Sequence, residues 1–220
     1  MHTIAIVSQK GGAGKTTLAL HLAVEAERSG LPTAVVDLDP QASATGWGDS
    51  RAADSPVVVS AQASRLGQVL ATAREAGARL AIIDTAPHSE SAALASAREA
   101  DLVLIPCRPA ILDLRAISQS VDLAKLAGKR AAIVLNAVPP RGSLTEEAIQ
   151  AVEGYGVEVA PIQLGHRAAF VHCLTAGLTA QDFEPEGKAA GEIAGLFQWI
   201  RQQLGRNHDQ QEAQLVGSIA

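Results

Sequence analysis

The chain has 220 residues, of which 47% are hydrophobic and 19% are charged, which excludes a disordered or collagen-like protein and allows one sizeable core. A formal net charge of −5 argues against a permanently DNA-coating protein, because such domains are usually strongly basic. Alanine is abundant at 42 residues, whereas only three Phe, two Trp and one Tyr occur. Small side chains suit close helix–sheet packing, and the shortage of aromatic rings argues against a base-stacking surface.

The two cysteines, Cys107 and Cys173, lie far apart, and neither has a second cysteine at metal-ligand spacing. We expect both to be free thiols in or near the core of a protein from a reducing compartment. His166, His172 and Cys173 are better interpreted as polar and core positions of one helix than as a metal cluster. No basic segment precedes a long apolar stretch, and no window of about 18 apolar residues occurs, so we expect a cytoplasmic protein.

Short apolar runs alternate with helical patterns along the chain. In chain order, the first half predicts a strand at 3–8, a helix with Leu18, Leu22 and Ala26 on one face, strands at 33–36 and, weakly, 56–59, a helix at 61–76, a strand at 80–83 and a helix at 91–100. The second half predicts a strand at 102–105, a helix at 112–127, a strand at 131–135, a helix at 144–152, a strand at 157–160, and helices at 166–176 and 186–204.

This alternation indicates the α/β class, with a doubly wound, mostly parallel sheet flanked by helices. We expect a single domain over residues 1–204 and a polar, frayed tail over residues 205–220.

A glycine-rich segment between the first strand and the first helix is the most informative feature. It reads Gly11-Gly12-Ala13-Gly14-Lys15-Thr16-Thr17. Glycines let successive backbone N–H groups converge on phosphate oxygens, and the N-terminus of the following helix adds positive potential. We therefore expect a nucleotide-phosphate site in which Lys15 reaches the β- and γ-phosphates and the Thr16 hydroxyl binds Mg²⁺.

A second lysine, Lys10, precedes the glycines, and Gln9 stands where a plain phosphate loop has its first glycine. Residues 10–17 resemble the deviant Walker A box of the ParA/MinD class of P-loop ATPases, which are SIMIBI-type P-loop NTPases. The resemblance implies ATP and Mg²⁺ as cofactors, slow intrinsic ATP hydrolysis, nucleotide binding by the whole loop, and catalytic roles for Lys10 and Lys15. It also implies that Lys10 reaches the ATP of a partner subunit, so that an ATP-dependent homodimer completes the site, with filaments left open.

Acidic residues end two of the predicted strands. Asp37 and Asp39 follow the second strand, and Asp84 follows the fourth. Ligands of doubly wound sheets bind beyond the carboxyl ends of the strands, where these side chains are expected. By the same resemblance, Asp84 is the Walker B residue and Asp37 supports the Mg²⁺ shell, whereas Asp39 positions the attacking water. Residues 40–47 and 85–89 would be the switch segments that sense the γ-phosphate.

The base of the nucleotide is expected near Asn136, which ends the strand at 131–135. A carboxamide donates and accepts hydrogen bonds at once, which matches the edge of adenine. The family often has an asparagine here and lines the base pocket with the loop after the last strand, around Pro161 and Ile162. A turn residue at the strand end is the alternative role for Asn136.

Over roughly residues 1–204, the chain resembles the small ParA-type, ParF-like partition ATPases. Asp39-Pro40-Gln41 with Trp47, and the segment 105–109, are typical of that group. Residues 210–220 contain no Lys or Arg, so we expect no membrane anchor. The resemblance implies a nucleoid-associated protein that binds DNA non-specifically and has a ParB-like or ribbon-helix-helix centromere-binding partner. The candidate DNA-contacting cations are Lys129, Arg130, Arg141, Arg167, Lys188, Arg201 and Arg206.

Two other functions stay open. One is a relative that positions a protein cargo by the same ATP cycle. The other is a small-molecule ATP-dependent ligase of the same superfamily, similar to dethiobiotin synthetase. Lys10 and the segment Asp39-Pro40-Gln41 favour partition or positioning over the ligase.

Overall fold

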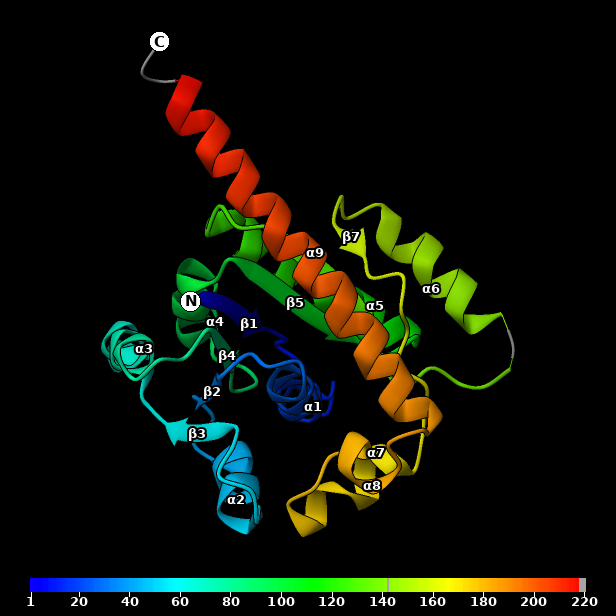
Figure 1. The fold of residues 1–220 in the computed structure, drawn as a ribbon. Coiled ribbons are helices and arrows are strands. Elements are labelled where there is room, and N and C mark those ends of the chain that lie inside the picture. The colour runs from blue at the N-terminus through cyan, green and yellow to red at the C-terminus, as the bar shows by residue number, and fades with distance from the viewer. Residues whose placement is uncertain (142, 218–220) are drawn as a thin grey trace.

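The computed structural model describes residues 1–141 and 143–217, and its centre is a parallel sheet of seven strands (Figure 1). The strands are β1 (His2–Ile6), β2 (Thr33–Asp37), β3 (Val57–Ser60), β4 (Leu80–Asp84), β5 (Leu102–Cys107), β6 (Ala131–Leu135) and β7 (Glu158–Val159). They lie in the order β3-β2-β4-β1-β5-β6-β7, and every pairing is parallel. The predicted α/β class and doubly wound sheet are therefore confirmed.

Helices connect the strands. They are α1 (Lys15–Arg28), α2 (Ser43–Ser50), α3 (Leu66–Glu75), α4 (Glu90–Glu99), α5 (Ile111–Leu126), α6 (Leu144–Glu153), α7 (Ala169–His172), α8 (Ala180–Phe183) and α9 (Lys188–Gly217). Single 3₁₀ turns at Ala63–Arg65 and Leu174–Ala176 precede α3 and follow α7. The single helix expected at 166–176 is thus two short pieces.

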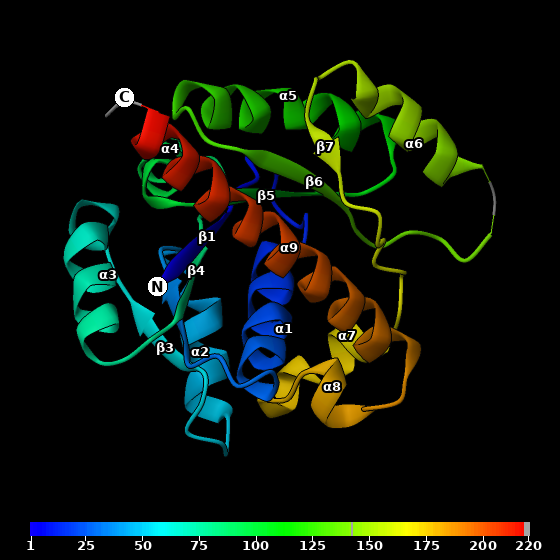
Figure 2. The ribbon, with the colours of Figure 1, turned by 45° about the horizontal axis from the view of Figure 1, so that its top comes forward.

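The sheet is buried on both faces because its strands are apolar at consecutive positions. Along β1, Ile4 and Ile6 belong to a core shared with α1, α2, α7, α8 and α9. Ala5 and the following Val7 belong to a second core, shared with α3, α4, α5 and α6. Figure 2 shows these two helical layers on opposite sides of the strands. Alternate side chains of one strand therefore hold two layers together.

Two further segments also differ from the expectation. Residues 43–50 form the short helix α2, which the sequence pattern does not predict because the helix contains two glycines. Tertiary contacts stabilise it: Ala44 and Trp47 are buried, and the Trp47 Nε1–H donates to the Leu178 carbonyl at 3.0 Å.

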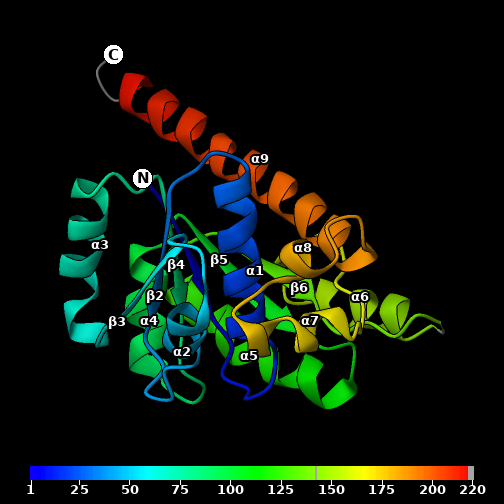
Figure 3. The same ribbon diagram turned by 60° about the horizontal axis from the view of Figure 1, so that its bottom comes forward.

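The second difference is at the C-terminal end. Helix α9 continues past residue 204 to Gly217, so the expectation of a frayed tail is wrong for residues 205–217, and residues 218–220 lie outside the described part. No proline interrupts the segment, and residues 210–215, Gln-Gln-Glu-Ala-Gln-Leu, are all good helix formers. Figures 1 and 3 show the last turns extending beyond the sheet. Among the described residues, we find no helix with the length and apolar content needed to span a bilayer.

Candidate nucleotide-binding site

The glycine-rich loop follows β1, which lies between β4 and β5 in the middle of the sheet, and leads into α1 (Figure 3). This position is the carboxyl edge of a doubly wound sheet, where such folds bind ligands. The loop has the backbone conformation that its glycines predict, since Gly12 has φ of +72° and Gly14 has φ of +91°. At Gly14 a Cβ atom would lie 2.2 Å from Asn136 Nδ2, so glycine is required by both conformation and space.

Lys15 begins α1 and points into the site. Its side chain is buried, and its Nζ donates to the Lys10 carbonyl at 3.5 Å, which is a long contact for an ammonium group. Burial lowers the pKa of Lys15, whereas the carboxylates of Asp84 and Asp39 oppose that change. A desolvated ammonium with one long hydrogen bond is well placed to bind the phosphates of a nucleotide.

Lys10 lies on the exposed side of the loop. Its Nζ forms an ion pair with Asp113, in the first turn of α5 of the same chain. The Asp113 side chain is 12% exposed, whereas that of Lys10 is 43% exposed, so the lysine remains accessible from outside. The sequence did not single out Asp113. Its one signal is general, because an acidic residue is favoured in the first turn of any helix.

The two strand-end aspartates lie side by side. Asp37 and Asp84 are register partners on β2 and β4, and both are fully buried. The Asp37 carboxylate is occupied: Oδ1 accepts from the Asp39 N–H at 3.0 Å, and Oδ2 accepts from the N–H and hydroxyl of Thr45 at 3.0 and 3.1 Å. These bonds fix the loop after β2 and the first turn of α2, so Asp37 has a structural task beside the metal role expected for it.

Asp84 has the opposite environment. Although Thr16 is near enough to favour the charged carboxylate, neither Asp84 oxygen has a hydrogen-bond partner of ordinary geometry among the described residues. Burial raises the pKa of Asp84 to about 7, and the neighbouring charge of Asp37 adds to this effect. A buried, unpartnered carboxylate beside a threonine hydroxyl fits a hard cation such as Mg²⁺.

No group of three or more His, Cys, Asp and Glu side chains in the described part is arranged to hold a metal alone.

Asp39 lies at the rim of a cavity of about 970 Å³ that is also lined by Pro40, Pro87 and Ser89. Its Oδ1 accepts from the Gln41 N–H at 2.9 Å, and it is partly exposed. The two expected switch segments therefore face one cavity. The second of them is tied to the phosphate loop, since the His88 N–H donates to the Gln9 carbonyl at 3.3 Å.

Asn136 contacts the phosphate loop directly. Its Nδ2 donates to the Ala13 carbonyl at 2.8 Å, and its Oδ1 accepts from the Ala137 N–H at 2.8 Å. Both ends of the carboxamide that was expected to read adenine are thus engaged with backbone. Pro161 is exposed after β7, and a small cavity of about 180 Å³, lined by Val138 and Gln163, lies beside the loops that follow β6 and β7.

His21 is a further residue that the sequence did not single out. It is fully buried on α1; its Nδ1 lies 2.7 Å from the Thr17 carbonyl, and its Nε2 accepts from the Ala180 N–H at 3.0 Å. Burial lowers the pKa of His21 to about 4, so the ring is neutral. It joins the helix that follows the phosphate loop to α8. Nothing in its sequence surroundings marks it, because a lone histidine on a helix carries no motif.

A glycine-rich loop after the central strand, a buried lysine at its end and the buried Asp84 at the end of the neighbouring strand β4 define the site of a P-loop nucleotide-binding protein. The comparisons with known proteins agree. The family described as the CobQ/CobB/MinD/ParA nucleotide binding domain matches residues 4–173. The chain therefore belongs to this family, within the ParA/MinD class of P-loop ATPases.

Named relatives span almost the whole chain. Maintenance of carboxysome distribution protein A of Halothiobacillus neapolitanus is 30% identical over 200 residues, which is 86% of this chain and 91% of the relative. The protein of the same name from Gloeobacter kilaueensis is 31% identical over 209 residues, or 93% and 94%. Among solved structures, MinD of Pyrococcus horikoshii complexed with Mg-ADP superimposes with a TM-score of 0.75 at 18% identity, covering 94% of this chain and 98% of that one.

Proposed function

We propose that this ParA/MinD-class ATPase is a positioning ATPase, which uses ATP and Mg²⁺ to switch between a monomer and a DNA-bound dimer and thereby distributes a protein cargo. Hydrolysis, stimulated by a partner protein, would return it to the monomer. The choice of a protein cargo is supported by the relatives that span nearly the whole chain, since both are named for maintaining carboxysome distribution.

Partition of a plasmid or chromosome is the second candidate. A Protein ParA from Rhizobium radiobacter is 30% identical, but over 125 residues, which is 56% of this chain. The Escherichia coli Protein IncC is 26% identical over 91% of this chain. For this candidate, the expected partner is a ParB-like or ribbon-helix-helix centromere-binding protein.

The phosphate loop and the strand ends supply the ATP site. Residues 10–17 would surround the phosphates, with Lys15 on the β- and γ-phosphates. Thr16 and Asp84 would hold Mg²⁺, which when bound neutralises charge on the β- and γ-phosphate oxygens. Asp39, at the rim of the adjoining cavity, would orient the attacking water through its second oxygen, which accepts no hydrogen bond from the described residues. Catalysis of this kind depends on positioning and electrostatics rather than on a strong base.

The ion pair between Lys10 and Asp113 is the observation on which we base the proposed ATP-dependent change from monomer to dimer. It holds the partly exposed Lys10 side chain against α5 of its own chain, whereas the buried Lys15 donates its Nζ hydrogen bond to the Lys10 carbonyl. A lysine placed outside its own phosphate site is suited to reach a nucleotide bound by a second subunit. ATP-dependent dimerisation would then replace the Asp113 carboxylate by a phosphate as the partner of Lys10. The phosphate has more negative charge and therefore binds the ammonium group more strongly.

Binding to DNA would depend on the dimer. Two of the seven candidate cations are already engaged: Arg167 pairs with Glu192, and Arg130 bonds to Gln203. Lys129, Arg141, Lys188, Arg201 and Arg206 are exposed or partly exposed. With a chain charge of −5, a few phosphate contacts per subunit give weak and strongly salt-dependent binding, which two subunits together would strengthen.

The test is retention of the full chain on non-specific duplex DNA with ATP, with ADP and without nucleotide, at several salt concentrations. We expect retention with ATP at low salt, and its loss with ADP and in Lys10→Ala. Equal retention in all three nucleotide states would contradict the proposal. A second experiment separates the two candidate functions. ATP hydrolysis is measured with the protein encoded by the neighbouring gene, in the presence and absence of the DNA site that this protein binds. If stimulation depends on the DNA site, partition is the function.

A further inference from the structure

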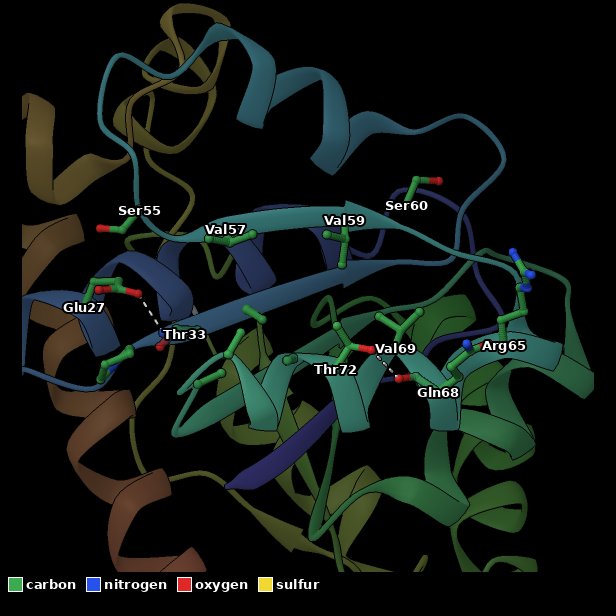
Figure 4. A pocket seen from close by; sticks show the side chains of 15 residues that line it. Glu27, Thr33, Ser55, Val57, Val59, Ser60, Arg65, Gln68, Val69 and Thr72 are labelled. Carbon is green, nitrogen blue, oxygen red and sulfur yellow. Dashed lines mark hydrogen bonds between the residues drawn. The ribbon is translucent and has the colours of Figure 1, made fainter.

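An open apolar groove lies between the edge of the sheet and α3, away from the phosphate loop. Its volume is about 670 Å³, and Figure 4 shows the side chains that line it. Val57 and Val59 of β3 face Val69 of α3 across the groove, which Ala73 of the same helix also lines. Val57 is 55% exposed, one of the few large hydrophobic residues left so open. Helix α2 covers the opposite face of β3, where Val58 packs against Gly48.

Strand β3 also has an open edge. It is the outermost strand on its side, and its ladder partner among the described residues is β2 alone. Its outer backbone N–H and C=O groups therefore face outward along a strand of four residues, about 13 Å in length. Such an edge accepts an additional strand, whose main-chain bonds give affinity and whose alternate side chains enter a neighbouring groove.

The two ends of the groove carry opposite charges. Glu27 lies at the end near Val57, and Arg65 lies at the other end, beyond Ser60 (Figure 4). Arg65 is exposed and forms no ion pair with any described side chain. A segment that lies along the groove is therefore favoured if it has a basic residue at the first end and an acidic residue at the second.

We propose that this groove binds an extended segment of a partner protein, which pairs with the outer edge of β3. The segment places two small apolar side chains, two residues apart, between the valines of β3 and α3. A Lys or Arg meets Glu27, and an Asp or Glu meets Arg65. The open strand edge favours a peptide over a small apolar molecule, because backbone groups are needed to pair with those of β3.

The groove adjoins the cavity at whose rim Asp39 lies. Ser60, Arg65 and Val69 line both this groove and the 970 Å³ cavity that contains Asp39. A bound segment would thus contact the same helix that borders the switch residues. The groove would therefore be the docking site of the partner protein that stimulates hydrolysis. This choice of partner rests on the proposed function.

The test uses the full chain and a labelled peptide, Lys-Thr-Val-Thr-Val-Thr-Glu, blocked at both ends. Binding is measured by fluorescence anisotropy, and strand pairing by hydrogen exchange of residues 57–60. Wild type is compared with Val57→Glu and Arg65→Glu, and with Val171→Glu as a matched control, since Val171 is a 68% exposed valine on α7. A second peptide has proline at its central position and lacks the N–H that pairing needs. ATP-dependent dimerisation and basal hydrolysis are measured in the same samples.

We expect wild type and Val171→Glu to bind the first peptide equally and to show slower exchange in β3. Val57→Glu and Arg65→Glu should each weaken binding at least about tenfold, and Val57→Glu, which lies outside the cavity that contains Asp39, should leave basal hydrolysis unchanged. No binding to wild type at about 1 mM peptide, equal binding of the proline peptide, or binding unaffected by Val57→Glu would overturn the docking site. A nucleotide-independent dimer that Val57→Glu abolishes would instead assign the edge to a second copy. If wild type does not hydrolyse ATP, the proposed function is wrong, whereas the docking site is judged by the peptide binding data.

Discussion

Lys10 is ion-paired with Asp113 of its own chain, so the residue expected to act across a dimer is held by an internal partner. Asp113→Asn removes the competing charge. We expect the dissociation constant of the ATP dimer to fall by up to about fivefold, because a partly exposed ion pair contributes at most about 1 kcal/mol. Sedimentation equilibrium in ATP and Mg²⁺ measures this. Asp122→Asn, an exposed carboxylate on the same helix, is the control, and a weaker dimer in Asp113→Asn would contradict this interpretation.

Asp39 is expected to orient the attacking water and to leave ATP binding to other groups. Asp39→Ala should therefore form an ATP dimer whose turnover falls at least about 100-fold, while the affinity for ATP stays within a factor of about two. Phosphate release under single-turnover conditions is the measurement, with Asp49→Ala as an exposed control on α2. Hydrolysis at the wild-type rate would remove Asp39 from the mechanism.

Replacing Asp84 or the neighbouring Asp37 by asparagine should change the free energy of unfolding in opposite directions. In the nucleotide-free protein at pH 8, Asp84→Asn should raise the free energy of unfolding, by up to about 4 kcal/mol, because the buried carboxylate is unpartnered and its pKa of about 7 leaves it ionised. Asp37→Asn should lower it, because an amide nitrogen cannot accept the Thr45 hydrogen bonds. Denaturant unfolding checks both.

The same pair also tests the metal site. ATP with Mg²⁺ should stabilise wild type against thermal unfolding, and Asp84→Asn should lose the part of that stabilisation that depends on Mg²⁺. An undiminished Mg²⁺ effect in Asp84→Asn would exclude Asp84 from the metal shell.

Asn136 is expected to support the phosphate loop in addition to any contact with the base. Its Nδ2 donates to the Ala13 carbonyl of the loop. Asn136→Ala should therefore weaken the binding of ATP and of inorganic tripolyphosphate by similar factors, about tenfold each. Isothermal titration with both ligands measures the two affinities. A loss confined to ATP would instead identify Asn136 as a residue that reads adenine.

His21 should make stability depend on pH. Its pKa of about 4 in the fold lies below the ordinary value of 6.5, so the neutral ring is favoured by folding. Its contribution, on the order of 3 kcal/mol, is present above pH 6.5 and is lost as the pH falls toward 4. The difference in unfolding free energy between wild type and His21→Gln should therefore shrink between pH 7 and pH 4.5. A constant difference for His21→Gln would contradict the assignment.

Local patterns were sufficient to predict the architecture. Buried strands such as Leu80–Asp84 are apolar almost throughout, and the order of strands and helices determines a parallel, doubly wound sheet. The phosphate loop was predicted for the same reason, because its chemistry depends on consecutive residues. Asp37 and Asp84, although 47 positions apart, were predicted at one sheet edge because both end strands.

Contacts between distant segments were not predictable in this way. Asp113 meets Lys10 only because α5 begins beside the loop, and His21 meets Ala180 only because α8 folds back on α1. Helix α2 forms through the hydrogen bonds of Asp37 to Thr45 and the burial of Trp47, although its own sequence is a poor helix former. The groove beside β3 is the space between β3 and α3, and no local sequence pattern predicts how far apart a strand and a helix pack.

We expect ATP to assemble a dimer of this protein through Lys10. Sedimentation velocity of wild type and Lys10→Ala, each with ATP and Mg²⁺ and with ADP and Mg²⁺, tests it most directly, with nucleotide affinity measured in parallel. We expect a dimer for wild type with ATP, monomers in the other three samples, and similar nucleotide affinities for both proteins. An ATP-dependent dimer of Lys10→Ala, or a wild type that stays monomeric with ATP, would contradict it.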